Sequence, residues 1–148
     1  MWSSDGRSLY LSVTKGAEKP SIWKAAADGS NTQKFLDEAC FVMDVSPDGK
    51  YLLGVLFFGD EVGIYEISTT DKKRVALLPG VDTFEARFSP DGKSFLYAVA
   101  SRAEVTFYRQ AWSKGKLIGK PQIALKFPFS FSLSYRGNAL PTFPPGGT

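Results

Sequence analysis

A five-residue motif recurs at a constant interval in this chain. Ser-Pro-Asp-Gly-Lys occurs at residues 46–50 and again at 89–93, and a divergent copy, Ser-Ser-Asp-Gly-Arg, occurs at 3–7. The aspartates of successive copies are 43 positions apart in both cases. Such an interval is typical of repeat proteins, and about 40–45 residues is the length of one four-stranded repeat of a propeller. Each repeat must therefore bury its apolar face against its neighbours.

The composition of the motif predicts a hairpin turn. Short segments rich in β-branched and aromatic residues precede it at 41–45 and 84–88 and follow it at 9–13, 51–57 and 95–99, as expected for paired strands. Proline presets its own φ, aspartate hydrogen-bonds nearby backbone, and glycine adopts the positive φ that reverses the chain. We therefore predict structural turn roles for Asp5, Gly6, Pro47, Asp48, Gly49, Pro90, Asp91 and Gly92.

Each repeat contains two more candidate strands. The third strand has a central aromatic residue and is predicted at 21–24, 63–67 and 105–109. A polar turn separates it from a fourth strand, predicted at 33–36, 75–78 and 123–127. Four antiparallel strands per repeat form the blade of a β-propeller. The sequence thus predicts an all-β fold, a partial β-propeller of about three blades.

The repeat also predicts the domain organisation. Blades are expected at residues 2–40, 41–83 and 84–138, and residues 139–148 resemble the start of a further repeat. The third repeat is longer because residues 127–136 add material, predicted to be an extended edge segment or an added hairpin. A closed propeller usually has roughly 4 to 8 blades, so we expect this chain to be a fragment of a longer propeller.

Several kinds of chemistry have no support in the sequence. Histidine is absent, which removes the commonest general base and zinc ligand. Neither a nucleophile elbow nor a glycine-rich phosphate-binding loop is present. The single cysteine, Cys40, precedes an apolar strand and is predicted to be a buried structural thiol. We therefore expect no enzyme activity, no cofactor and no metal site.

Charge and hydropathy narrow the range of partners. The 18 basic and 15 acidic residues are scattered, and only residues 72–74 form a basic run, whereas nucleic-acid binding needs a broad basic surface. No apolar run approaches the length of about 18 residues that suggests a membrane span, and the start lacks the pattern of a secretion signal. We expect no nucleic-acid partner and no membrane insertion by this segment.

Three charged residues lie on the predicted first strands, which are the innermost strands of a propeller. Asp44 and Arg87 occupy the same position in successive repeats, and Glu85 shares a strand face with Arg87. One interpretation is that Asp44 and Arg87 form an ion pair between adjacent blades. The alternative is that these charges line the mouth of a central channel and contact a ligand. An acidic loop at 59–61 is interpreted as a solvated loop, with ligand binding as its alternative.

The motif, followed by an apolar strand and then a strand with a central aromatic residue, resembles the TolB-like branch of the WD-type propeller repeats. The resemblance extends from Trp2 to Ile123, although Ser4 replaces proline in the first copy and Gly146 replaces aspartate in the tail. It implies a ring of about six blades and a periplasmic or other extracytoplasmic bacterial location. It also implies that some members are attached to a serine/threonine kinase or a prolyl-oligopeptidase-type hydrolase.

These observations favour a non-catalytic propeller scaffold for protein–protein interaction or ligand sensing. The alternative is a regulatory or substrate-gating propeller domain whose catalytic domain lies outside this chain. The partner is expected to be another protein or the remaining blades of a larger propeller. A head-to-tail homodimer is a third arrangement, because two chains would place about six blades in a ring and pair the open strand edges.

Overall fold

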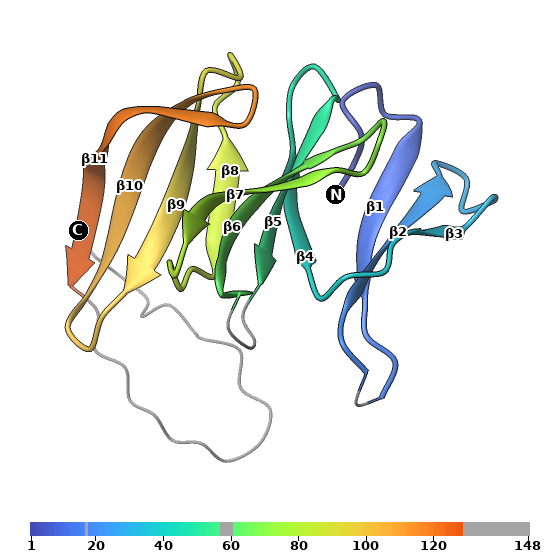
Figure 1. The fold of residues 1–148 in the computed structure, drawn as a ribbon, viewed down its shortest axis with the longest axis horizontal. Helices are drawn as coiled ribbons and strands as arrows, with labels where there is room; N and C mark the ends of the chain where they lie inside the picture. The colour runs from blue at the N-terminus through green and yellow to red at the C-terminus, as the bar shows by residue number, and fades with distance from the viewer. Residues whose placement is uncertain (17, 57–60, 129–148) are drawn as a thin grey trace, which may run out of the picture.

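The computed structural model describes residues 1–16, 18–56 and 61–128, which form three antiparallel sheets (Figure 1). The first sheet contains β1 (Ser8–Val13), β2 (Ser21–Ala26) and β3 (Gln33–Leu36). The second contains β4 (Phe41–Val45), β5 (Tyr51–Leu56), β6 (Gly63–Ser68) and β7 (Arg74–Pro79). The third contains β8 (Glu85–Phe88), β9 (Ser94–Ala100), β10 (Glu104–Ser113) and β11 (Lys116–Pro128). The predicted all-β fold with a sheet for each repeat is confirmed.

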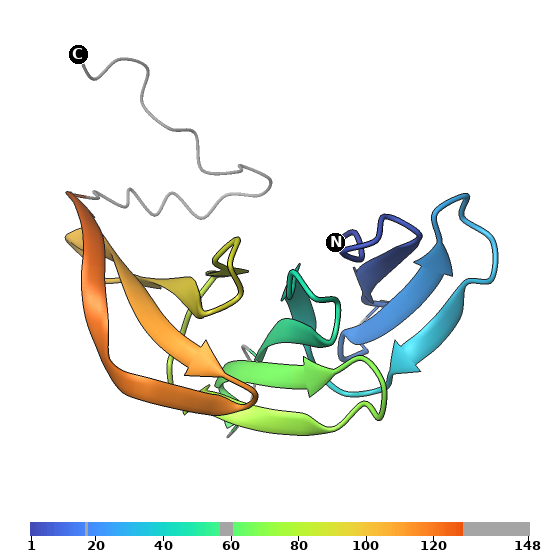
Figure 2. The same ribbon diagram turned by 90° about the horizontal axis from the view of Figure 1, so that it is seen from above.

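The three sheets lie side by side along an arc, and in each of them consecutive strands pair (Figure 2). The first strands β4 and β8 lie toward the concave side of the arc, and the last strands lie toward the convex side (Figure 2). In the first sheet, Trp2 forms a β-bridge with Leu9, and the N–H of Tyr10 donates to the carbonyl of Met1 at 2.7 Å. Residues 1–2 thus extend the inner edge of this sheet where the other sheets have a first strand.

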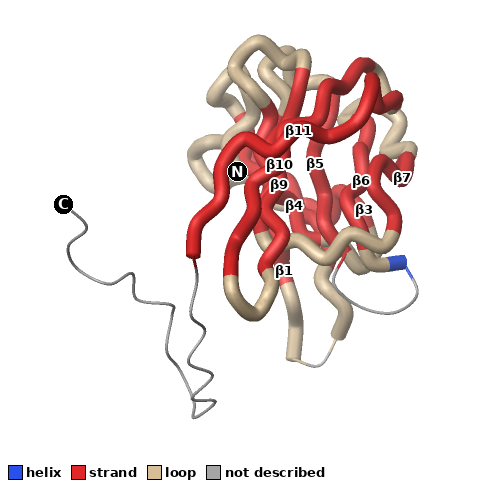
Figure 3. The backbone as a smooth tube through the Cα atoms, turned by 90° about the vertical axis from the view of Figure 1, so that its left-hand side faces the viewer, coloured by secondary structure: helices blue, strands red, loops and turns tan. Residues whose placement is uncertain are grey.

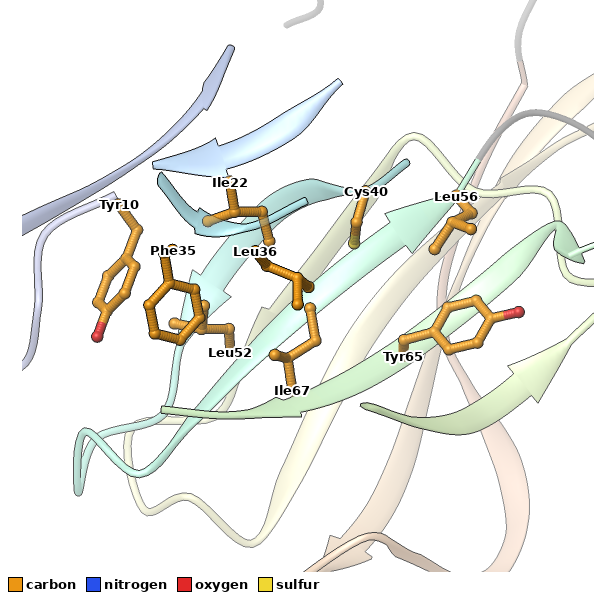
Figure 4. Close-up of a cluster of buried hydrophobic side chains, with 9 residues drawn as sticks. All are labelled: Tyr10, Ile22, Phe35, Leu36, Cys40, Leu52, Leu56, Tyr65 and Ile67. Atoms are coloured by element: carbon orange, nitrogen blue, oxygen red, sulfur yellow. The ribbon is translucent and has the colours of Figure 1, made fainter. Parts of the chain in front are cut away.

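Two apolar cores lie between the sheets. The first joins the first and second sheets, and its nine side chains converge from facing strands and the β3–β4 connection (Figure 4). The second joins the second and third sheets through Leu53, Val55, Ile64, Leu77, Ala86, Phe88, Phe95, Tyr97 and Trp112. Burying one Leu, Ile or Phe side chain contributes about 1.5–3 kcal/mol. Packing between sheets therefore supplies the main apolar stabilisation of the arc.

The last hairpin of the third sheet is longer than the sequence predicts. β10 and β11 have 10 and 13 residues, and their turn at Lys114 and Gly115 has positive φ at both residues, as in a type I′ turn. The register shift between Arg109 and Ala111 lets β11 continue past Gly119 and Pro121, two residue types that weaken a strand, and a second shift leaves Ala124 without a partner residue on β10. Most of the predicted extra segment and the predicted further repeat fall within 129–148, outside the described residues.

A β-bulge in β4 changes which side chains face each core. The sequence pattern places Phe41, Met43 and Val45 on one face. In the structure, Val42 and Val45 pack against the first core, whereas Met43 packs against the second. The register shift between Val42 and Asp44 leaves Met43 as an extra residue and breaks the simple alternation.

Candidate functional site

The repeated motif forms a hydrogen-bonded turn in which serine and aspartate act together. The Ser46 hydroxyl donates to Asp48 Oδ1 at 2.7 Å and accepts from the N–H of Tyr51 at 3.0 Å. Asp48 Oδ1 also accepts from the N–H of Lys50 at 3.1 Å. Gly49 has a φ of 72° and donates its N–H to the Ser46 carbonyl at 2.8 Å. The two side chains thus bind backbone donors that lie inside the turn.

The same contacts are present in the other two copies. The Ser3 hydroxyl donates to Asp5 Oδ1 at 2.7 Å. The Ser89 hydroxyl donates to Asp91 Oδ1 at 2.6 Å. These serines carry no predicted role, although a serine precedes the turn in every copy. Their contacts explain how the first copy keeps the turn with Ser4 in place of proline.

Successive turns also contact one another. A Cβ atom at Gly49 would lie 2.6 Å from Ser4 Oγ, and one at Gly92 would lie 3.5 Å from Pro47 Cδ. Ser4 and Pro47 hold equivalent positions in the motif, so each turn lies against the glycine of the next turn. Pro90, the equivalent residue of the third turn, is exposed. At Gly49, a glycine is needed both for the positive φ and for this close approach.

Hydrogen bonds hold the turn aspartates in their ionised form. The Ser89 hydroxyl, followed by the N–H of Lys93, lowers the pKa of Asp91, and equivalent bonds lower the pKa of Asp5. Burial acts to raise the pKa of Asp48, but the hydrogen bonds that this carboxylate accepts outweigh burial, and its pKa is also lowered. These carboxylates therefore stabilise the fold in their charged state.

Replacing Ser46 with alanine is expected to lower the free energy of unfolding by about 1–2 kcal/mol, because the N–H of Tyr51 loses its acceptor and Asp48 loses a donor. A carboxyl with a lowered pKa stabilises the fold above its ordinary pKa of 3.8, and this stability is lost as the pH falls through the lowered value. The cost of S46A should therefore shrink at acid pH. Urea unfolding at about pH 7 and about pH 3 measures both effects. An equal decrease in the free energy of unfolding for S46A and for the exposed control S113A would contradict the structural role of the Ser46 hydroxyl.

The charges of the first strands lie at the boundary between the second and third sheets. Asp44 Oδ2 accepts from the N–H of Phe88 at 2.8 Å, and Oδ1 accepts from the N–H of Val45 at 2.9 Å. Arg87 Nε pairs with Glu85 Oε1 at 2.9 Å, and these side chains are 44% and 36% exposed. Asp44 thus links the two sheets through the backbone of Phe88, and not through the predicted ion pair with Arg87. The Glu85–Arg87 pair remains accessible to solvent.

A buried carboxylate that no sequence pattern predicted also joins these two sheets. Glu66 of β6 is only 5% exposed, and its Oε2 accepts from Trp112 Nε1 and from the N–H of Gly115, each at 2.7 Å. Burial raises the pKa of Glu66, and the two hydrogen bonds oppose this rise without cancelling it. The one sequence signal is a glutamate inside an otherwise apolar strand.

Glu61 is the one described residue of the predicted acidic loop. Arg74 binds it at 3.1 Å, binds Glu38 at 2.9 Å, and lies over the Tyr65 ring at 4.7 Å from the ring centroid. The Glu61 carboxylate thus belongs to an ion-pair network at the surface. In the described ranges, no group of three or more His, Cys, Asp or Glu side chains could hold a metal ion. Within the same ranges, no helix is long and apolar enough to cross a membrane.

Apolar side chains gather on the side of the third sheet that faces away from the second sheet. The register places Phe107 beside Leu125 on this side and also brings Phe127 there. Residues that alternate with them on β9 and β10 pack in the second core. Leu96 is 41% exposed, and Leu125 and Phe127 are each 48% exposed. We call Leu96, Phe107, Leu125 and Phe127 the outer face.

A shallow depression of about 400 Å³ adjoins the outer face. Lys93, Arg109 and Lys120 line it with positive charge, and Asp91 adds one negative charge. Arg109 Nε donates to Ser94 Oγ at 3.2 Å, which holds the guanidinium against the sheet. The surface of the third sheet therefore combines exposed apolar side chains with a net positive charge.

Three antiparallel sheets placed side by side along an arc, each with its first strand inside and its last strand outside, define the described part of the chain as β-propeller blades. Solved structures show that the fold is that of a TolB-like β-propeller. A scan against protein-family models and a search of curated proteins found no match.

The similar structures include two bacterial TolB proteins. A TolB from Agrobacterium tumefaciens matches with a TM-score of 0.66 and 19% identity, over 74% of this chain and 40% of that chain. TolB from Acinetobacter baumannii matches with a TM-score of 0.64 and 22% identity, over 78% of this chain and 30% of that chain. A nidogen/laminin complex matches with a TM-score of 0.64 and 12% identity, over 84% of this chain and 46% of that chain. The chain thus matches less than half the length of each of these structures.

Proposed function

We propose that this chain is a non-catalytic propeller scaffold that binds another protein or senses a ligand. The observation that carries the proposal is the outer face, in which Leu96, Leu125 and Phe127 are 41%, 48% and 48% exposed. The opposite side of the same sheet is buried in the second core. Covering exposed apolar area contributes roughly 25 cal/mol per Å², so this surface favours association.

The state of the ionisable groups supports a role without catalysis. The turn aspartates are engaged by their own serines, and Glu66 is engaged between two sheets. Burial raises the pKa of the Cys40 thiol to about 12, so this thiol is protonated at neutral pH and is a poor nucleophile. One of the similar structures is a complex of two proteins, nidogen and laminin, which supports the use of this fold for protein binding.

A second copy of the chain is one candidate occupant of the outer face. The far side of the first sheet also exposes apolar residues, with Leu11 39% and Trp2 55% exposed. A head-to-tail arrangement would cover the outer face of one copy with this side of the next copy. Further blades of a larger propeller, or an unrelated protein, would cover the same surface.

A double variant of the outer face tests the proposal. L125D/F127D should keep the thermal unfolding curve but lose binding, because it places two charges on the exposed apolar surface. Peptides selected from a displayed library on the wild-type chain should bind the double variant at least about tenfold more weakly and should bind the exposed control A103D unchanged. Light scattering shows whether the wild type is a dimer and whether the double variant is a monomer. Two results would contradict the proposal. One is that the selected peptides bind L125D/F127D with the same affinity as the wild type. The other is that the wild type is a monomer and no peptide in the library binds it.

A further inference from the structure

β11 differs from the last strands of the other two sheets in length and exposure. It has 13 residues, against 6 in β7 and 4 in β3. Every residue of β11 except Leu117 is exposed, including Ile118, Ile123, Leu125 and Phe127. One edge pairs with β10, and no described residue pairs with the other edge, which lies at the margin of the third sheet (Figure 3). Long apolar edges of this kind are ready to pair with another strand.

Two prolines define the part of this edge that can accept a strand. Pro121 and Pro128 have no N–H and cannot donate to a ladder. Residues 122–127 lie between them, and those whose N–H and C=O groups point away from β10 present backbone donors and acceptors to the free edge. Six residues is about the usual length of a strand in a globular protein. This stretch is therefore long enough for one complete added strand.

The charges of the last hairpin select the kind of partner. β11 contains Lys116, Lys120 and Lys126 and has no acidic residue. Glu104 of β10 already pairs with Lys126 at 2.7 Å. Arg109 of β10 lies beside Gln122 in the register and adds another positive charge one strand inside the free edge. An incoming segment with acidic side chains would compensate these charges, whereas a basic segment would be repelled.

The apolar residues of the free edge lie on both faces of the sheet. Leu125 and Phe127 belong to the outer face. Ile123 pairs with Tyr108, whose ring packs against the second core, so Ile123 lies on the opposite face. A lipid surface would contact apolar groups on one face, whereas an added strand presents side chains to both faces. The distribution therefore favours an extended peptide over a membrane.

We propose that β11 binds an extended acidic segment of another protein, which pairs with residues 122–127 as a fifth strand of the third sheet. This inference rests on the proposed scaffold function and names its partner class. Backbone hydrogen bonds along the edge supply affinity, and the side chains on the two faces supply selectivity. Acidic side chains of the segment reach Lys120 and Arg109, and apolar side chains pack beside Ile123 and Leu125.

A synthetic seven-residue peptide of alternating glutamate and valine tests the proposal. It should bind the full chain with a Kd below about 1 mM, and salt should weaken binding because the charges are exposed. Those amides of residues 122–127 that point away from β10 should gain protection from hydrogen exchange when the peptide binds. The same peptide with lysine in place of glutamate, and the acidic peptide with alternate backbone nitrogens methylated, should each bind at least about tenfold more weakly.

Two variants locate the binding to β11. The first is a proline at a position within 122–127 whose N–H points away from β10, which should remove a donor from the free edge while keeping the sheet and should abolish binding. K120E should weaken binding at least about tenfold, and K19E, at an exposed lysine between β1 and β2, should leave binding unchanged. The thermal unfolding curve of each variant shows that the fold is kept.

The remaining outcomes contradict strand addition in distinguishable ways. Equal affinity for the methylated peptide would exclude pairing through the backbone, and equal affinity for the lysine peptide would exclude charge selection. Binding of anionic phosphatidylserine vesicles without peptide binding would identify a lipid surface as the ligand. The glutamate–valine peptide could fail to bind while library peptides bind the wild type and lose affinity for L125D/F127D. That result would overturn this inference and leave the proposed scaffold function supported.

Discussion

Replacing Phe95 with alanine is expected to lower the free energy of unfolding by about 3–5 kcal/mol. Phe95 is fully buried in the second core, opposite Phe88 across the β8–β9 ladder, and its ring centroid lies 6.0 Å from that of Tyr97. The truncation removes apolar contacts and leaves a cavity between two sheets that cannot close without moving one of them. Because a domain is stable by only about 5–15 kcal/mol in total, the loss should be readily visible in urea unfolding followed by circular dichroism.

The neighbouring residue provides a matched control for this variant. Leu96 is 41% exposed on the outer face, so L96A should cost less than about 1 kcal/mol. In a repeat protein, stability is approximately a sum of repeat and interface contributions. F95A should therefore reduce hydrogen-exchange protection in β9 and β10 more than in β1 and β2, which pack in the first core. An equal loss of hydrogen-exchange protection in all three sheets would argue against two separate cores. So would an equal decrease in the free energy of unfolding for F95A and L96A.

Local rules explain why the sequence predicts so much of this fold. The turn residues act within six positions of one another, and the strand patterns on either side have a period of about two. The recurrence of both features predicts the three sheets and the all-β architecture. The role of the serines could not be predicted because serine is common in loops of every kind, and only the hydrogen bonds of Ser46 and its equivalents reveal this role.

Contacts between sheets could not be predicted in the same way. The position of Asp44 suggested a link to the next blade, but whether it meets Arg87 or the backbone of Phe88 depends on how the sheets are rotated relative to one another. Glu66 meets a tryptophan 46 positions further along the chain, which no local pattern records. β11 is longer than predicted because one register shift accommodates Gly119 and Pro121 within a paired strand.

Replacing Trp112 with phenylalanine is expected to cost about 2–3 kcal/mol at neutral pH, because a buried carboxylate loses one of its two donors. The phenyl ring keeps part of the packing against Tyr51 and Phe88, whose ring centroids lie 5.5 and 5.1 Å from that of Trp112. The main loss is therefore the hydrogen bond from Nε1 to Glu66. Replacing both partners, in E66L/W112F, should cost about 1–2 kcal/mol less than the sum of the two single variants.

The pH dependence of this cost distinguishes a lost hydrogen bond from lost packing. Burial raises the pKa of Glu66, so the native state binds a proton more readily than the unfolded chain, and stability falls as the pH rises from the ordinary value of 4.5 to the raised one. Removing the tryptophan donor raises this pKa further, and the cost of W112F should therefore shrink as the pH falls and Glu66 becomes protonated. In an E66Q background, the cost of W112F should not vary with pH across this window. Urea unfolding of the wild type, W112F, E66Q and E66Q/W112F at about pH 4 and about pH 7 measures these costs. If W112F lowers the free energy of unfolding of the wild type equally at both pH values, Trp112 stabilises the interface by packing alone.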